Sequence, residues 1–552
     1  MTRLDGDCLL QLGHGARQRR VQGVITGGTG LLAESISRDK VLTKKLMKQL
    51  GLPTAEGRLV RDPEDAWAAA CEIGLPVVVK PRDADYGNGV SVHLFTKAQV
   101  IAGWELARQF RTDVLVERHL AGVPHRLLIV NDVLVAAVRR DPAHVFGDGR
   151  QTMSELIAAA NRDPRRGDGP EFPWFPILID EMLLQALARQ GLHLASVPPE
   201  GLFITLQYNP NTCYAEMIRD VTESVHPDVS AAARDAVRVT GLDIAGVDVM
   251  AVDISRPLAE QEGGILEVNA GPAIYLHRSP ACNPPRPVAE AVVAALIPPH
   301  ETGTIPIIAV IGEGLATATA RRIGDLLENA GQCAGVSCAA GLRVGGRVIT
   351  TTRADDAAGC QALLLHSRVE TAICVLSATS IRESGLPFDD CQVAVLTGRT
   401  GSTALSEKSA LLENCRRVLV DAVSADGTVV VNVEDPALAA TCTPGDEHLM
   451  AIANSEDHPF LKQHASRGGI CAFINNGHAV ISRRNELLLR HRLTQESPSA
   501  DPPGLSQLLA IAAAWAAEGL IAEQVVADEP APMEHPVRRG RLYSENRVTV
   551  NM

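Results

Sequence analysis

The stretch Gly263-Gly-Ile-Leu-Glu-Val-Asn-Ala-Gly-Pro272 carries two oxygen-bearing side chains, Glu267 and Asn269, two residues apart. Its apolar residues predict a strand, and because side chains alternate along a strand, these two point to the same face. A third oxygen donor, Asp248, lies in Gly246-Val-Asp-Val-Met250, which predicts a buried strand. Three hard oxygen donors on neighbouring strands suit Mg²⁺ shared with nucleotide phosphates. We therefore predict a metal site at these three residues.

Two lysines and a glycine-containing loop lie upstream of this stretch. One lysine belongs to the pair Asp39-Lys40, and the other to the apolar run Val77-Val-Val-Lys-Pro81. The loop that follows is Asp83-Ala-Asp-Tyr-Gly-Asn-Gly-Val-Ser91. Lysines can place positive charge on a triphosphate, and backbone N–H groups of such a loop can approach the γ-phosphate while excluding water. The nucleotide-binding residues predicted here are Lys40, Lys80, Gly87, Asn88 and Gly89.

The order of these motifs is more informative than any one of them. A Lys-Pro after an apolar strand is usually a surface lysine, and a Gly-x-Gly is usually a turn. In this order within one α/β stretch, they resemble the parts of an ATP-grasp ligase. Such a ligase uses ATP to phosphorylate a carboxylate, and an amine then attacks the acylphosphate. Arg126 and Arg219 are the candidates for stabilising the developing charge or for holding a substrate carboxylate.

Composition limits the classes of function. A chain of 552 residues, with 46% hydrophobic and 21% charged residues, predicts two or three globular domains. The net charge of −13 and the 3% aromatic content disfavour nucleic acid as a partner. The twelve cysteines are scattered, which predicts isolated reduced thiols rather than a zinc site. We find neither a signal-peptide pattern nor an apolar run of about 18 residues, so we expect a cytoplasmic protein without membrane contact.

A Pro-rich stretch near residue 300 predicts the main domain boundary. Residues 1–300 alternate short β-rich runs with helical segments. After the boundary, Ile307-Ile-Ala-Val-Ile311 predicts a buried strand, followed by Gly312-Glu-Gly314 and a helix from about Ala316. That pattern is typical of the first βα unit of a parallel α/β domain. The predicted division is 1–300, 301–500, and a C-terminal segment 501–552 with one Ala-rich helix and a polar tail.

Several segments resemble the cyanophycin synthetase family, strongly from about residue 8 to 300 and more weakly to about 525. The resemblance implies an ATP-grasp domain that extends an aspartate backbone, followed by a Mur-ligase-like domain that attaches arginine to aspartate side chains. It also implies that Lys40 and Lys80 contact ATP, that Glu117 lies at the adenine hinge, and that the predicted metal residues bind Mg²⁺. The segments are Leu10-Gln-Leu-Gly-His-Gly15, Asp39-Lys-Val-Leu-Thr-Lys44, Ala143-His-Val-Phe-Gly-Asp-Gly149, Asn161-Arg-Asp-Pro-Arg-Arg-Gly167 and Asp220-Val-Thr-Glu-Ser-Val-His-Pro227.

The second half departs from the family pattern. The family's Mur-like half opens with a P-loop of the form Gly-Thr-Asn-Gly-Lys-Thr-Thr. The matching stretch is Gly312-Glu-Gly-Leu-Ala-Thr-Ala318, which has Ala316 in place of the phosphate-binding lysine and adds the negative charge of Glu313. We therefore expect a degenerate, catalytically inactive Mur-like domain. We also expect that the family's N-terminal domain and final Mur domain are absent.

These expectations favour a ligase that joins preformed β-aspartyl-arginine dipeptides, as the shorter, second class of the family does. Two alternatives remain open. A single-amide small-molecule ligase is favoured by the altered loop Asn209–Ala215, and a non-catalytic protein would sense ATP or the polymer. His125, His226 and His277 are predicted to be structural or substrate-orienting rather than acid–base groups. The family forms homo-oligomers, so we expect at least a dimer.

Overall fold

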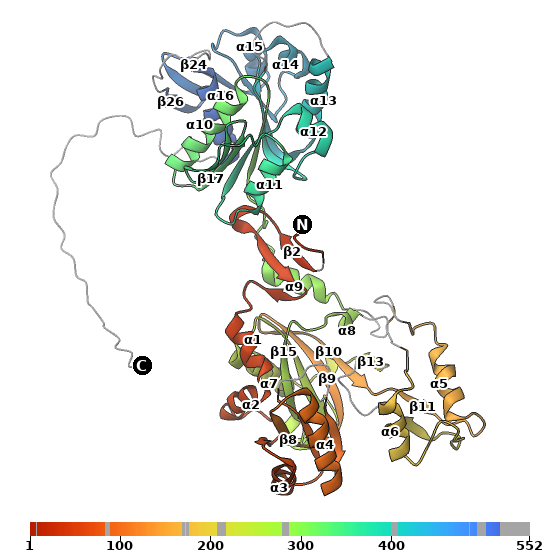
Figure 1. Ribbon diagram of the computed structural model, residues 1–552. Coiled ribbons are helices and arrows are strands. Elements are labelled where there is room, and N and C mark those ends of the chain that lie inside the picture. Colours follow the sequence, from red (N-terminus) through yellow and green to blue (C-terminus); the bar gives the residue numbers. More distant parts are fainter. Residues whose placement is uncertain are drawn as a thin grey trace, which may run out of the picture. The chain divides into compact units, whose positions relative to one another are not determined.

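A computed structural model of the protein divides into two compact units (Figure 1). The first unit is formed by Met1–Gly13 and Arg19–Gly303, and the second by His14–Gln18 and Thr304–Met552. Within the described part of the chain, no helix has both the length and the apolar character needed to cross a membrane. The structure describes residues 1–6, 8–82, 89–167, 172, 176–206, 217–278, 286–398, 407–484, 486–493 and 504–518.

The first unit contains a four-stranded antiparallel sheet with the strand order β5-β8-β6-β7. Helices α3 and α4 pack on Val79 and Val116 of this sheet. Because side chains alternate along each strand, Lys80 and Glu117 point to the opposite face, where the register makes them diagonal neighbours. The elements are β5 (Gly57–Val60), α3 (Pro63–Ile73), β6 (Val77–Pro81), β7 (Ser91–Leu94), α4 (Lys97–Phe110) and β8 (Val114–Arg118).

A second antiparallel sheet in this unit has five strands in the order β13-β10-β9-β14-β15. One face, which includes Leu127 and Val247, is apolar and packs against helices. The other face carries Asp248, which the register pairs with Arg126 on β9 and with Glu267 on β15. The elements are β9 (Val123–Val130), β10 (Val133–Asp141), β13 (Met217–Asp220), α7 (Pro227–Thr240), β14 (Ile244–Ala251) and β15 (Gly264–Ala270).

Two consecutive helices, α1 (Leu31–Arg38) and α2 (Lys40–Gln49), meet at Asp39. The Asp39 side chain caps α2, because it accepts the backbone N–H groups of Val41 and Leu42 at 3.1 Å each. Such a cap satisfies amide groups that have no partner inside the helix and fixes its first turn. Helix α2 contacts the edge strand β15, so this first turn lies beside the five-stranded sheet.

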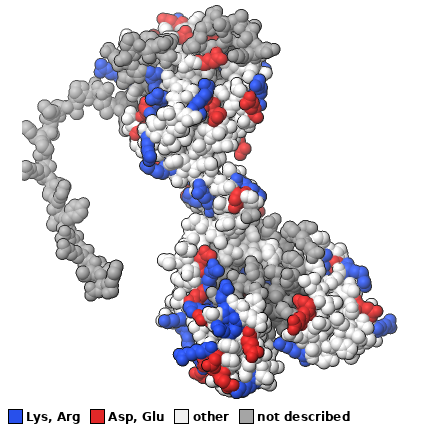
Figure 2. Space-filling model, in the orientation of Figure 1, with Lys and Arg blue, Asp and Glu red and all other residues white. Residues whose placement is uncertain are grey.

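Two smaller sheets complete the first unit. The four-stranded one has the order β1-β2-β3-β4, and β11 and β12 form a two-stranded sheet whose buried side chains share a core with α5 and α6. Figure 2 shows basic and acidic side chains interspersed over the visible face of this unit. The elements are β1 (Thr2–Arg3), β2 (Leu9–Leu12), β3 (Arg19–Gln22), β4 (Ile25–Thr26), β11 (His144–Phe146), α5 (Met153–Asn161), α6 (Glu181–Arg189), β12 (Phe203–Thr205), α8 (Tyr275–Arg278) and α9 (Val288–Leu296).

The second unit is built on one eleven-stranded sheet, with the order β19-β18-β17-β20-β16-β21-β22-β23-β24-β25-β26. Strands β17 to β24 of that order run parallel, and antiparallel strands extend both edges. Its strands are β16 (Ile307–Ile311), β17 (Ala334–Cys338), β18 (Gly341–Val344), β19 (Arg347–Thr350), β20 (Thr371–Val375), β21 (Cys391–Leu396), β22 (Val423–Asn432), β23 (Leu449–Ile452), β24 (Ile470–Asn475), β25 (His478–Arg483) and β26 (Glu486–Arg492). Its helices are α10 (Ala316–Asn329), α11 (Ala357–Leu365), α12 (Ala378–Ser384), α13 (Glu407–Asp421), α14 (Pro436–Thr441), α15 (Pro459–Ser466) and α16 (Leu505–Glu518).

The first βα unit of this domain is confirmed, because the fully buried strand β16 leads into α10. The Ala-rich helix α16 belongs to the same core, since Leu508 and Leu509 are fully buried against this sheet and α10. The prediction of isolated thiols is wrong for one pair. Cys360 on α11 and Cys374 on β20 form a disulfide, because these two elements pack directly against each other.

Candidate active site

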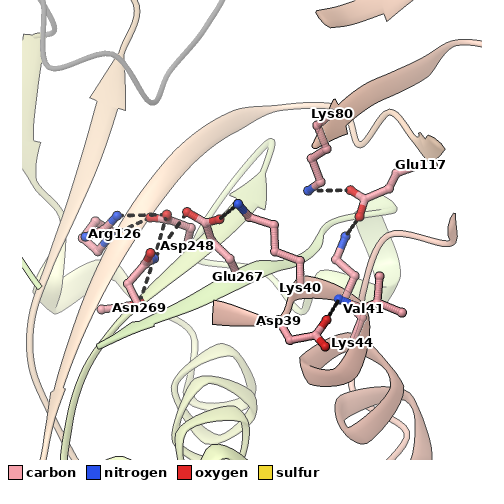
Figure 3. A network of polar contacts seen from close by, with 11 residues as sticks. Asp39, Lys40, Val41, Lys44, Lys80, Glu117, Arg126, Asp248, Glu267 and Asn269 are labelled. Atoms are coloured by element: carbon pink, nitrogen blue, oxygen red, sulfur yellow. Dashed lines mark hydrogen bonds and ion pairs between the residues drawn. The ribbon is translucent and has the colours of Figure 1, made fainter. Parts of the chain in front are cut away.

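A buried carboxylate between two lysines forms one part of the candidate site (Figure 3). Lys80 Nζ lies 2.8 Å from Glu117 Oε2, and Lys44 Nζ pairs with Glu117 Oε1. The three residues are only 8%, 9% and 2% exposed for Lys80, Lys44 and Glu117. Burial acts to raise the pKa of Glu117, but the two lysines outweigh burial and hold this pKa below its usual value. Glu117 is therefore an ionised carboxylate shared by two cations.

The second part of the site lies on the five-stranded sheet. Arg126 grips Asp248 with two hydrogen bonds, Nε to Oδ1 at 2.6 Å and Nη2 to Oδ2 at 2.9 Å. Asn269 Nδ2 donates to Asp248 Oδ2 at 3.2 Å and to Glu267 Oε1 at 3.4 Å. Burial and the neighbouring Asp248 carboxylate raise the pKa of Glu267. A buried carboxylate, Asp248, and a partly buried one, Glu267, thus stand side by side on one face, as the spacing of these residues predicts.

Helix α2 joins the two parts. Lys40 Nζ lies 3.7 Å from Glu267 Oε2, while Lys44, one turn further along the helix, reaches Glu117. Residues four apart lie on the same side of a helix, so one side of α2 presents a cation to each sheet. Figure 3 shows Lys40 and Lys44 extending from α2 toward these two carboxylates. The site therefore contains cations and carboxylates from the sheet β5-β8-β6-β7 and from the five-stranded sheet.

The predicted metal residues fit a magnesium ion by the chemistry of their donors. Among the described residues, no group of three or more His, Cys, Asp or Glu side chains is placed to hold a metal. The set here is two carboxylates and one amide, which leaves positions for phosphate oxygens and water, as Mg²⁺ prefers. A cation would relieve the repulsion between Asp248 and Glu267 that raises the pKa of Glu267. Such a cation would bind the amide oxygen of Asn269, whereas the N–H group of this amide now faces the two carboxylates.

Arg219, the other candidate arginine, lies apart from Arg126, and its catalytic role stays a prediction. The register of β10 with β13 pairs Arg219 with Arg139, and that of β10 with β9 pairs Arg139 with His125. Side chains in this row point away from the face that carries Arg126. Arg219 is largely exposed and lies 3.4 Å from Asp141. The sequence alone assigns Arg219 neither to a strand nor to one face of a sheet.

The glycine-containing loop is only partly described. Gly87 and Asn88 lie outside the described residues, as does the altered loop 209–215. Gly89 is described, has φ +70°, and a Cβ there would lie 3.0 Å from Pro81 and 2.8 Å from Phe110. Glycine is therefore required at this position both by the backbone conformation and by the space available.

The three histidines occupy places outside the ion pairs just described. His125 is on the sheet face opposite Arg126, and burial lowers its pKa to about 4. Burial likewise lowers the pKa of His277 to about 4, so both rings are neutral at pH 7. His226 caps helix α7 by accepting the backbone N–H of Asp228. His226 thus has a structural role, and the roles of the buried, neutral rings of His125 and His277 stay predictions.

Sequence reasoning missed Lys44 and Arg140 as site residues. Lys44 stands four residues after Lys40, and this spacing on a predicted helix was the available signal. Arg140 follows Arg139 on β10, so its side chain points to the opposite sheet face, which is the face that carries Arg126. Arg140 is buried there. Its charge contributes to the lowered pKa of Asp248, after the larger effects of burial, which opposes the shift, and of Arg126.

Comparison with known proteins identifies part of this region. A family model described as the carbamoyl-phosphate synthase L chain, ATP binding domain, matches residues 39–133, which run from the cap of α2 to the start of β10. The fold and the site together place the chain in the ATP-grasp class. Over most of its length, the chain is similar to the cyanophycin synthetases.

The relatives extend this similarity beyond residues 39–133. The chain is 33% identical over 477 residues to cyanophycin synthetase of Trichormus variabilis, covering 86% of this chain and 53% of that protein. It is 31% identical over 484 residues to cyanophycin synthetase of Synechocystis sp., covering 87% and 55%. A glutathione biosynthesis bifunctional protein GshAB of Mannheimia succiniciproducens is 29% identical over 301 residues, covering 53% and 40%. The chain spans about half the length of these cyanophycin synthetases.

Proposed function

We propose that this protein is an ATP-dependent carboxylate–amine ligase that works through an acylphosphate. The observation that carries the proposal is the arrangement around α2, where Lys40, Lys80 and the carboxylates Asp248 and Glu267 converge from separate elements. An ATP-grasp ligase needs cations for the triphosphate beside a carboxylate pair for a metal ion. This arrangement contains both.

The reaction has two steps. A carboxylate oxygen of the first substrate attacks the γ-phosphorus of ATP, the bond from that phosphorus to the β–γ bridging oxygen breaks, and ADP leaves. The amine of the second substrate then attacks the acyl carbon, phosphate leaves, and the nitrogen loses a proton. Lys40 and Lys80 bind the phosphates, and Arg126 faces the charge that develops on the transferred group. No side chain of the protein forms a covalent bond to the substrate.

Asp248, Glu267 and Asn269 would hold the magnesium ion. When bound, that ion supplies positive charge that offsets the phosphate oxygens. The protein's own contribution is to fix these donors on two paired strands, where Arg126 and Lys40 already balance their charge. We propose the same residues as the metal site because hard oxygen donors in pairs are what Mg²⁺ selects.

We further propose that the second unit does not bind ATP productively. Helix α10 begins at Ala316, where a P-loop would carry its lysine, and Glu313 adds negative charge at the position of the phosphates. A protein with one working site makes one kind of bond. Given its relation to the cyanophycin synthetases, we propose that it joins preformed β-aspartyl-arginine dipeptides. A cytoplasmic location and a homo-oligomeric state stay predictions.

The substrate proposal is tested by ADP release and product masses. Purified protein with Mg-ATP is given β-aspartyl-arginine, or aspartate plus arginine, or a panel of other carboxylates and amines. We expect ADP release and a ladder of oligomers with the dipeptide alone. A single condensed product from another pair would support a single-amide ligase instead. No ADP release with any substrate would overturn the ligase proposal and favour an ATP-sensing protein.

A further inference from the structure

Lys44 has no part in the proposed reaction, yet its charged side chain is buried beside the site. Its ammonium group pairs with one oxygen of Glu117, while Lys80 holds the other oxygen (Figure 3). The two lysines come from different elements, Lys44 from α2 and Lys80 from β6. A buried carboxylate with two cationic partners has one more than charge balance requires.

The second cation matters once a nucleotide arrives. A buried carboxylate that loses its partner is strongly disfavoured, so Glu117 holds on to whatever cation it has. If Lys80 were its only partner, the phosphates of ATP would have to compete with Glu117 for the Lys80 ammonium group. Lys44 removes this competition, because Glu117 keeps one cation when Lys80 turns to the phosphates.

We propose that Lys44 is a positioning residue of the nucleotide site, which neutralises Glu117 so that Lys80 is available to the phosphates of ATP. This inference rests on the proposed ATP site. Lys44 acts through Glu117 and does not itself touch the nucleotide. Lys40, on the same side of α2, instead reaches Glu267 on the other sheet, so the two lysines of this helix have different tasks.

The charge state of Lys44 agrees with this role. Burial lowers the pKa of Lys44 to about 8, the attraction of Glu117 opposes this effect, and the repulsion of Lys80 adds to it. Two cations therefore crowd one carboxylate in the nucleotide-free protein. Withdrawal of Lys80 toward a triphosphate relieves that crowding and leaves a matched Lys44–Glu117 pair.

The test is a double-mutant cycle on nucleotide affinity. The variants are Lys44→Met, Glu117→Gln and the combination of both, titrated calorimetrically with Mg²⁺ and a non-hydrolysable ATP analogue. In the native background, Lys44→Met should raise the Kd by about tenfold or more, because Glu117 then retains Lys80. In the Glu117→Gln background, the same substitution should change the Kd by less than about threefold, because no carboxylate remains to be neutralised.

Controls separate this role from a structural one. Lys45→Met changes an exposed lysine on the same helix and should leave the Kd unchanged. Lys44→Arg keeps the charge and should retain most of the affinity. Lys44→Met alone leaves Glu117 paired with Lys80, so it creates no uncompensated buried charge, and Lys44→Arg supplies a second variant if Lys44→Met unfolds for another reason.

Two results would overturn the inference. Equal losses of affinity from Lys44→Met with and without Glu117→Gln would mean that Lys44 acts on the nucleotide directly. Native affinity in the Lys44→Met variant would mean that Lys44 has no role in binding. Wild-type protein that binds no nucleotide would overturn the proposed function as well, so failures of the two proposals are distinguishable.

Discussion

At the scale of single residues, the site is organised by opposite charges that satisfy one another before any ligand is bound. Glu117 lies between two lysines, and Asp248 is gripped by Arg126. Buried charges are tolerated only when they are paired in this way. Each pair also indicates where a ligand would bind. A phosphate can replace a carboxylate as the partner of a lysine, and a metal ion can replace a guanidinium as the partner of a carboxylate.

Arg126 and Arg219 are predicted to behave differently when substituted. Arg126→Gln should lower kcat by about a hundredfold or more, because it removes charge-stabilising hydrogen bonds beside the reacting group. Arg219→Gln should leave kcat within about twofold, since an exposed pair such as Arg219–Asp141 contributes little. Steady-state ADP release measures both. A loss in Arg219→Gln as large as that in Arg126→Gln would contradict the assignment of the two sheet faces.

The lowered pKa of Lys44 predicts a pH dependence of ATP affinity. In the free protein this ammonium group loses its proton above about pH 8, whereas the bound triphosphate favours the protonated form. Binding above pH 8 must therefore take up a proton, and the Kd should rise by up to about tenfold per pH unit. Calorimetry in two buffers of different ionisation enthalpy measures the uptake. Uptake that persists in Lys44→Met would assign it to another group.

At the scale of elements, the strands and their faces follow from alternation, while the contacts between elements do not. The pair Glu267 and Asn269 and its neighbour Asp248 were predictable from spacing and apolar flanks, and the first βα unit of the second domain was predictable from β16. The face of Arg219 depended on the register of β10 with β13, which no local pattern encodes. The Lys44–Glu117 pair likewise depends on how α2 packs across two sheets.

The cap of α2 gives a prediction at this scale. Asp39→Ala removes the cap and the ion pair with Arg82, and it should cost about 1 kcal/mol of stability or somewhat more. It should also weaken ATP binding, because the first turn of α2 positions Lys40 and Lys44. Asp62→Ala removes a comparable cap from α3, away from the site, and serves as the matched control. Equal effects of the two substitutions on ATP affinity, at similar losses in Tm, would contradict the role assigned to α2.

In the whole molecule, the two α/β units differ in whether they contain residues that could bind a nucleotide. The first unit brings cations and carboxylates together around one helix. The second keeps the parallel sheet and the helix α10, but the start of that helix lacks the lysine that a P-loop requires. A large, well-packed unit can be retained for its structure after its site is lost, since stability depends on the core rather than on the site.

This division predicts one nucleotide per chain. Calorimetric titration with Mg²⁺ and a non-hydrolysable ATP analogue should give a stoichiometry of one, and Lys80→Met should abolish that binding. Glu313→Gln in the second unit should leave both stoichiometry and affinity unchanged. Two nucleotides per chain, with one surviving in Lys80→Met, would show that the second unit binds ATP despite Ala316.

If the first unit activates a carboxylate as an acylphosphate, one oxygen of that carboxylate must pass to the released phosphate. The substrate that supports ADP release is prepared with ¹⁸O in its reacting carboxylate, and the phosphate released during amide formation is analysed by mass spectrometry. We predict one ¹⁸O in each phosphate, because one carboxylate oxygen leaves with the phosphoryl group. A folded Glu267→Gln variant should release no labelled phosphate. Amide formation with unlabelled phosphate, or full activity in Glu267→Gln, would contradict the proposed mechanism.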